Sequence, residues 1–198
     1  MQDTLLKMAL YVSLVLIVPG PTNTLLLSSG LKVGVRRTSP LIVAEALGYV
    51  VGISAWGFFL NALAASRPWL LVAVKLLSAA YILYLAVKMW RQSRALQHVA
   101  ASPVSFRDML LTTLMNPKAL LFASTLFPLA AFQSAPYFAW TIGAFLIVLV
   151  PIALAWSYLG VLLTARRSLA PHTPTLLRGA SLVLLMFSGT LMYSILAR

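Results

Sequence analysis

Six long apolar runs set the limits on what this chain can fold into. They cover approximately residues 5–27, 40–64, 68–90, 109–132, 136–163 and 176–196. An α-helix needs about 20 apolar residues to cross the hydrocarbon core of a bilayer, and each run reaches that length. The runs are continuous instead of alternating, which disfavours membrane β-strands. We therefore predict an all-α, multi-pass membrane protein with six transmembrane helices in one domain over residues 1–198.

The composition supports a membrane environment and excludes several classes of function. Hydrophobic residues make up 61% of the chain and charged residues 9%, whereas a soluble domain carries about a quarter charged residues. Although the net charge is +12, the basic residues lie between the apolar runs, so we expect a lipid bilayer and no nucleic acid as partner. There is no cysteine, and His98 and His172 are predicted loop residues. We therefore expect no metal site, no cofactor and no enzymatic activity.

The distribution of lysine and arginine predicts the orientation. Ten of these residues lie in the first, third and fifth loops, namely Lys32, Arg36, Arg37, Lys88, Arg91, Arg94, Arg107, Arg166, Arg167 and Arg178. The loops and ends on the other side carry three, namely Lys7, Arg67 and Arg198. Because basic loops stay in the cytoplasm, both termini are predicted outside.

The six runs divide into two halves of three, at about residues 1–90 and 108–198, with a basic cytoplasmic linker at about 91–107. An odd number of helices per half inserts the second half upside down, as in many small transporters. Pro21 and Pro117 are 96 residues apart, and so are Pro40 and Pro136. We therefore predict two inverted three-helix repeats.

The first and fourth runs contain polar interruptions. These are Pro19-Gly20-Pro21-Thr22-Asn23 and Asn116-Pro117-Lys118. Proline has no N–H to donate and clashes with the preceding helical turn, so each motif predicts a helix broken in mid-membrane. The freed carbonyls then need another partner or a wet cavity. A plain proline kink is the alternative for each motif taken alone.

The same motifs are good helix starts and together suggest a binding site. Asn116 is a preferred N-cap that places Pro117 at the first helical position. New helix N-termini attract anions, and Lys118 adds a full positive charge. The freed carbonyls suit an ammonium group. We therefore predict a midplane site for a zwitterionic substrate, formed by Pro19, Gly20, Pro21, Thr22, Asn23, Asn116, Pro117 and Lys118.

Two further charged residues lie inside predicted spans, where charges are usually functional. Glu45 lies beside a face of small residues that includes Gly48 and Gly52, so we expect it to point inward and to carry a coupling proton. Its alternative is an ion pair with arginines of the first loop. Lys75 is a second candidate for coupling or gating, and its alternative is snorkelling to the outer interface.

At this point the motifs resemble those of the lysine exporter (LysE/RhtB) family. Pro19-Gly20-Pro21 with Asn23 resembles the first-helix signature, and Asn116-Pro117-Lys118-Ala119 resembles the fourth. Residues 79–85 are similar to the third helix, with Lys75 where the family often has lysine. The resemblance covers nearly the whole chain.

The resemblance implies export of amino acids or related small zwitterionic metabolites across the bacterial inner membrane, driven by protons. Many members carry a polar or acidic residue just after the second glycine of the second helix. This chain has Ile53 at that position, and the nearest carboxylate is Glu45.

We therefore predict a secondary active exporter with a small-molecule substrate, and leave open whether it forms a homodimer. A non-transporting membrane scaffold is the first alternative, but a scaffold has no need of buried polar breaks. A cation exporter on the same architecture is the second. One intramembrane carboxylate is a poor site for a divalent cation, which prefers several oxygen ligands.

Overall fold

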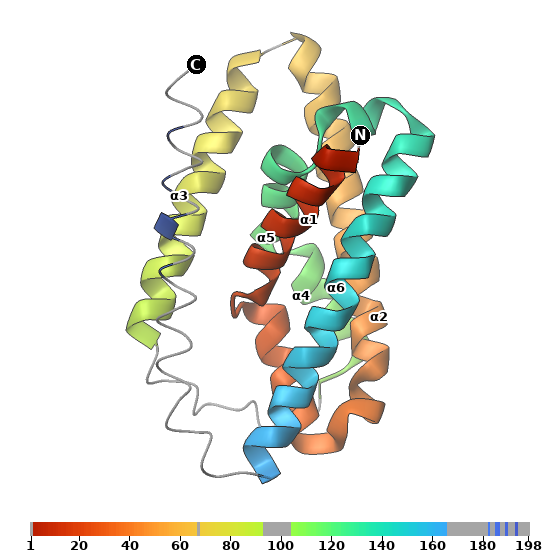
Figure 1. Cartoon of the computed structure of the whole chain (residues 1–198), viewed down its shortest axis with the longest axis vertical. Helices are drawn as coiled ribbons and strands as arrows, with labels where there is room; N and C mark the ends of the chain where they lie inside the picture. The colour runs from red at the N-terminus through yellow and green to blue at the C-terminus, as the bar shows by residue number, and fades with distance from the viewer. Residues whose placement is uncertain are drawn as a thin grey trace.

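The computed structural model describes residues 2–66, 68–92 and 104–165, together with positions 182, 185, 186, 189 and 193 (Figure 1). Every regular element in these ranges is helical, which confirms the all-α prediction for this part of the chain. Most of the predicted linker and of the sixth span lies outside the described residues. The side chain of Lys75 also lies outside them.

The helices differ from six uniform spans because several are interrupted. They are α1 (Gln2–Ile17), α2 (Pro21–Ser66), α3 (Pro68–Gln92), α4 (Phe106–Leu114), α5 (Pro117–Leu121), a π-helical turn η1 (Phe122–Leu126), a 3₁₀ turn η2 (Leu129–Gln133) and α6 (Ala135–Ala165). Within the described ranges, two stretches are each long and apolar enough to cross a bilayer, Pro21–Leu63, which a turn at Gly34 divides into two arms, and Ala135–Leu163. The breaks divide the first and fourth predicted spans into shorter pieces.

Helix α2 reverses direction at Gly34. This residue has φ 79° and ψ 167°, a region of backbone conformation that glycine adopts without steric penalty. The residues before it, 21–33, form a first arm, and residues 35–66 form a second arm that runs back alongside it (Figure 1). The predicted loop between the first two spans is therefore a one-residue turn. Pro40 lies inside the second arm, so its predicted place at a helix start is wrong.

Both predicted helix breaks are present. Helix α1 ends at Ile17 and α2 begins at Pro21, while α4 ends at Leu114 and α5 begins at Pro117. In Figure 1, α1 and the first arm of α2 run in one direction through the molecule, and α4 and α5 run in the opposite direction. Pro21 and Pro117 thus occupy equivalent places, whereas Pro40 and Pro136 do not. The inverted repeat stays a prediction.

Aromatic rings fill the centre of the helix bundle, where α6 packs across α2. Tyr49, Phe122, Phe127 and Phe145 make edge-to-face contacts with ring centroids 5.3–5.8 Å apart. Such contacts stabilise the core beyond the burial of apolar area alone.

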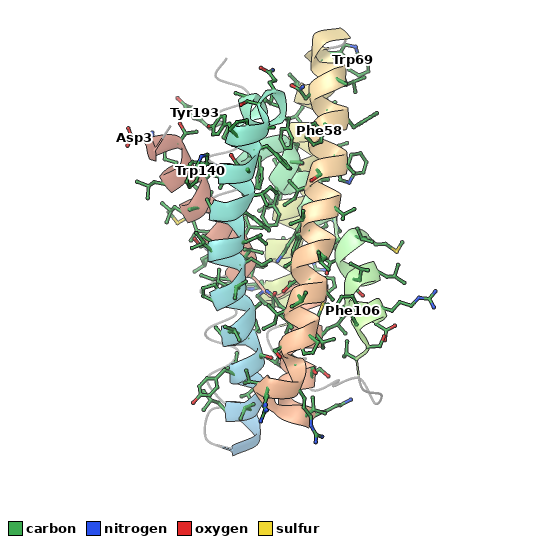
Figure 2. All side chains as sticks on the ribbon, turned by 90° about the vertical axis from the view of Figure 1, so that its right-hand side faces the viewer. Asp3, Phe58, Trp69, Phe106, Trp140 and Tyr193 are labelled. Atoms are coloured by element: carbon green, nitrogen blue, oxygen red, sulfur yellow. The ribbon has the colours of Figure 1, made fainter. Side chains whose placement is uncertain are left out.

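Large apolar side chains also cover the outside of the bundle. Trp140 and Ile147 on α6 are 66% and 75% exposed. Figure 2 shows Trp140 and Trp69 projecting outward in the upper half of the view. Helices that are apolar on every side are typical of membrane spans, so this outer surface fits contact with lipid.

The predicted small-residue face of the second arm of α2 is a packing face. A Cβ on Gly48 would lie 2.6 Å from Cβ of Thr113 in α4, and one on Gly52 would lie 3.0 Å from Cβ of Ala119 in α5. Larger side chains would push these helices apart. The two glycines therefore allow α4 and α5, which flank the second break, to pack closely against the second arm of α2.

Candidate substrate site

A lysine from the second half of the chain donates hydrogen bonds to free carbonyls at the C-terminal end of α1, where the first break begins. Nζ of Lys118 donates to the carbonyl oxygens of Val15 at 3.0 Å and Val18 at 2.9 Å. Lys118 is 1% exposed, so its ammonium is held inside the bundle and not at an interface. Lys118 therefore does not snorkel to a membrane interface in this structure.

Asn23, which follows the break, also donates hydrogen bonds to carbonyls at this end of α1. Its Nδ2 donates to the carbonyl oxygens of Leu16 at 2.7 Å and Val18 at 2.8 Å. Donors from the chain itself therefore satisfy carbonyls that the interruption releases. We expected a substrate ammonium at carbonyls of this kind, and the structure instead places Lys118 and Asn23 on them.

The start of α5 has the cap that the sequence predicts. Oδ1 of Asn116 accepts a hydrogen bond from the backbone N–H of Lys118 at 3.1 Å, and Pro117 is the first helical residue. The amide nitrogen of Asn116 also donates to the hydroxyl of Tyr49 at 3.1 Å. The cap is thereby tied to the second arm of α2.

Glu45 lies fully buried beside the two breaks. It is 0% exposed, and neither carboxylate oxygen has a hydrogen-bond partner. The Lys118 ammonium is close enough to interact with it electrostatically, although the two groups form no ion pair. The Thr22 hydroxyl neighbours the carboxylate and is itself buried without a partner. The expected inward orientation of Glu45 is confirmed, and the alternative, an ion pair with first-loop arginines, is absent.

The remaining predicted site residues differ in exposure. Pro21 and Pro117 are exposed, so in this structure they start helices and do not line the buried cluster. Pro19 and Gly20 are half-buried, and a Cβ on Gly20 would lie 3.2 Å from Nζ of Lys118. Lys75 lies in α3, and its side chain is outside the part of the chain that the structure describes.

The structure thus brings together one compact set of buried polar side chains from α2 and α5 and the residue before α5. We call it the polar cluster; it consists of Thr22, Asn23, Glu45, Tyr49, Asn116 and Lys118. It holds one cationic and one acidic side chain, with backbone carbonyls and two amides around them. Such a set can bind a small molecule that carries both charges.

Sequence reasoning missed Tyr49 and a hydroxyl pair between α3 and η1. Tyr49 lies four residues after Glu45, so the two share a helix face, and that spacing is the signal that could have found it. The hydroxyls of Ser78 and Ser124 lie 3.1 Å apart. Ser124 belongs to the π-helical turn η1, a conformation that frequently occurs at functional sites.

Among residues 2–66, 68–92 and 104–165, no group of three or more His, Cys, Asp or Glu side chains could hold a metal ion. The alternative of a cation exporter therefore gains no support from this part of the chain.

Several bacterial membrane proteins are similar in sequence. An uncharacterized membrane protein of Vibrio cholerae is 29% identical over 115 residues, and one of Pseudomonas aeruginosa is 32% identical over 127 residues. These alignments span 56% and 57% of both chains. The cysteine/O-acetylserine efflux protein of Escherichia coli K12 is 28% identical over 136 residues, 67% of this chain and 68% of the relative.

No solved structure matches the chain. The sequence profile of the LysE type translocators matches residues 13–195, a range that contains both helix breaks and Glu45. The chain therefore belongs to the LysE type translocator family.

Proposed function

We propose that this protein is a secondary active exporter of amino acids or related small zwitterionic metabolites. Membership in a translocator family and a relative named as an efflux protein support export. The observation that carries the choice of substrate is the buried polar cluster, in which Lys118 and Glu45 lie near each other without forming an ion pair. Opposite charges held apart can each receive the opposite end of a zwitterion.

The chemistry of the cluster favours a carboxylate on one side of the site. Nζ of Lys118 has one N–H left after its two hydrogen bonds to the α1 carbonyls. A substrate carboxylate that accepts from this N–H would gain a charge-assisted hydrogen bond in a dry environment, where the interaction is stronger than in water.

Proton coupling is assigned to Glu45. It is the acidic residue of the polar cluster, and the titratable groups that face it are Tyr49 from its own arm and Lys118 from α5. Tyr81 of α3 faces Tyr49 in turn. A buried carboxylate with no hydrogen-bond partner is stabilised by binding a proton, because the neutral form loses less hydration.

The proposed location is the bacterial inner membrane, with both termini outside. The bend of α2 and the C-terminal ends of α3 and α6 point toward the same end of the molecule, and the N-terminus of α1 lies toward the other (Figure 1). The described helix ends that precede the predicted basic loops therefore share an end, which supports the predicted orientation. The two broken helices run in opposite directions, which supports an inverted repeat.

Transport into vesicles tests the proposal. The purified chain is reconstituted, the vesicle interior is made acidic, and a panel of labelled amino acids that includes cysteine and O-acetylserine is offered outside. An exchanger moves its substrate against the proton flow, so at least one member of the panel should accumulate. Lys118→Ala should abolish accumulation, while the matched change at exposed Lys7, Lys7→Ala, should preserve it. No uptake of any member by the unaltered chain would overturn the proposal.

A further inference from the structure

The buried oxygens that lack hydrogen bonds are concentrated at one place. In the described ranges, five buried side-chain oxygens have no partner, and three of them belong to Thr22 and Glu45. The other two, on Ser28 and Ser157, are single hydroxyls elsewhere in the bundle. Burying an ionised carboxylate without hydrogen bonds costs far more free energy than burying a lone hydroxyl without them. When it is ionised, Glu45 therefore requires an additional group that neutralises it or donates hydrogen bonds to it.

Lys118 is not that group in this structure. Two hydrogen bonds to the α1 carbonyls hold its ammonium at the break, and it makes no ion pair with Glu45. A lysine ammonium has three N–H donors, so one remains for a ligand. The ammonium that would neutralise Glu45 by contact must therefore come from outside the cluster.

We propose, as an extension of the proposed function, that Glu45 and Thr22 bind the ammonium group of the exported zwitterion and that a proton takes the same place on Glu45 when the substrate has left. The substrate carboxylate then lies toward Lys118. The ligand class is a small molecule with a free ammonium group and a carboxylate.

Sharing one carboxylate makes export an exchange with protons. On the cytoplasmic side, the arriving ammonium displaces the proton of Glu45 into water. On the outer side, the substrate leaves with its ammonium intact, and Glu45 takes a proton from the external water. One proton therefore enters for each substrate exported, and no covalent bond other than O–H is made or broken.

The groups around Glu45 fit this exchange. Thr22 comes from the first arm of α2, Tyr49 from the second arm and Lys118 from α5. Thr22 can donate to the ionised carboxylate or accept from an ammonium, since a hydroxyl does both. Lys118 places a positive charge near the carboxylate.

Proton release on ligand binding tests the inference without transport. The purified full chain in detergent and weak buffer, with a pH indicator, is mixed with O-acetylserine over a series of pH values below about 7, where the ligand does not shift its acetyl group to nitrogen and release a proton of its own. Binding should release up to one proton per chain. N-acetylserine, an isomer with no ammonium group, should release none. Glu45→Gln should abolish release and Glu45→Asp should retain it, and the matched amide substitution at exposed Asp3, Asp3→Asn, should leave it unchanged.

A second measurement remains decisive if Glu45→Gln does not fold. For the unaltered chain, the Kd for O-acetylserine should rise about tenfold per pH unit of acidification where the carboxyl is protonated, because ligand and proton compete. Release that persists in folded Glu45→Gln, equal release by N-acetylserine, or an absence of O-acetylserine binding would each overturn the inference. Accumulation in the vesicle panel does not depend on these readouts, so it would stand if only this inference failed.

Discussion

The ammonium of Lys118 donates to the carbonyl oxygen of Val18 at 2.9 Å, across 100 residues of sequence. A helix that ends in a bilayer exposes carbonyls that no water can satisfy. In this chain the second half supplies the donor for the end left open in the first. The end of α1 and the start of α5 therefore stabilise each other, and a substitution at one should destabilise the other.

Replacing Lys118 with methionine tests this dependence. Lys118→Met keeps a long flexible side chain but removes the hydrogen bonds to the carbonyls of Val15 and Val18. Since a buried acceptor left without a donor costs about 1–3 kcal/mol, the free energy of unfolding should fall by about that amount. Thermal unfolding of the detergent-solubilised protein measures the loss. Lys7→Met at an exposed position is the control, and an equal effect of the two substitutions would contradict the prediction.

Asn23 should matter for the same carbonyls through an uncharged side chain. Asn23→Ala removes the donor to Leu16 and one of two donors to Val18, so we expect a loss of stability of about 1–3 kcal/mol. Asn61, which bonds to Gln133 at a more exposed position, offers the comparison. Asn61→Ala should change stability by no more than about 0.5 kcal/mol. The idea fails if Asn61→Ala destabilises the protein as much as Asn23→Ala does in the same unfolding assay.

The hydrogen bond between Asn116 and Tyr49 predicts coupling between two helices. In a double-mutant cycle, Tyr49→Phe and Asn116→Ala should show an interaction energy of about 0.5–1.5 kcal/mol. Tyr49→Phe keeps the ring that packs on Phe122 and Phe145, so the cycle isolates the hydroxyl. Additive effects of the two substitutions on unfolding would mean that the bond contributes nothing.

Local chemistry explains which parts of the site the sequence could predict. A proline without an N–H interrupts a helix wherever it lies, and an asparagine before a proline is a good cap in any context, so both breaks could be predicted. Glu45 beside a glycine face could likewise be placed inward. The partners of these groups could not. The contacts of Lys118 with the α1 carbonyls and of Asn116 with Tyr49 join residues far apart in the chain, and nothing local specifies them.

The turn at Gly34 was missed for a different reason. Polar and basic residues on both sides of it lower the hydropathy, which predicted a loop. Lysine and arginine are nevertheless good helix formers, so Lys32 and Arg36 continue their helices up to the turn. A single glycine with positive φ is then enough to reverse the chain.

The close crossing of α6 with the first arm of α2 predicts how glycine substitutions at this contact change stability. A Cβ on Gly30 would lie 2.0 Å from the backbone oxygen of Ser157, and one on Gly160 would lie 2.2 Å from that of Leu27. Backbone atoms cannot move aside as a side chain can, so Gly30→Ala and Gly160→Ala must force the helices apart.

Each substitution should therefore lower stability by at least the ~1–3 kcal/mol typical of overpacking. Gly143 in α6 is the matched control, because a Cβ there meets nothing within 4 Å. Gly143→Ala should raise stability by up to about 1 kcal/mol, since alanine is the better helix former. Unfolding temperatures of the three variants in one detergent decide the matter. If backbone contacts hold the crossing, Gly30→Ala and Gly160→Ala lower the unfolding temperature and Gly143→Ala does not. A change of the same sign in all three variants would contradict the prediction.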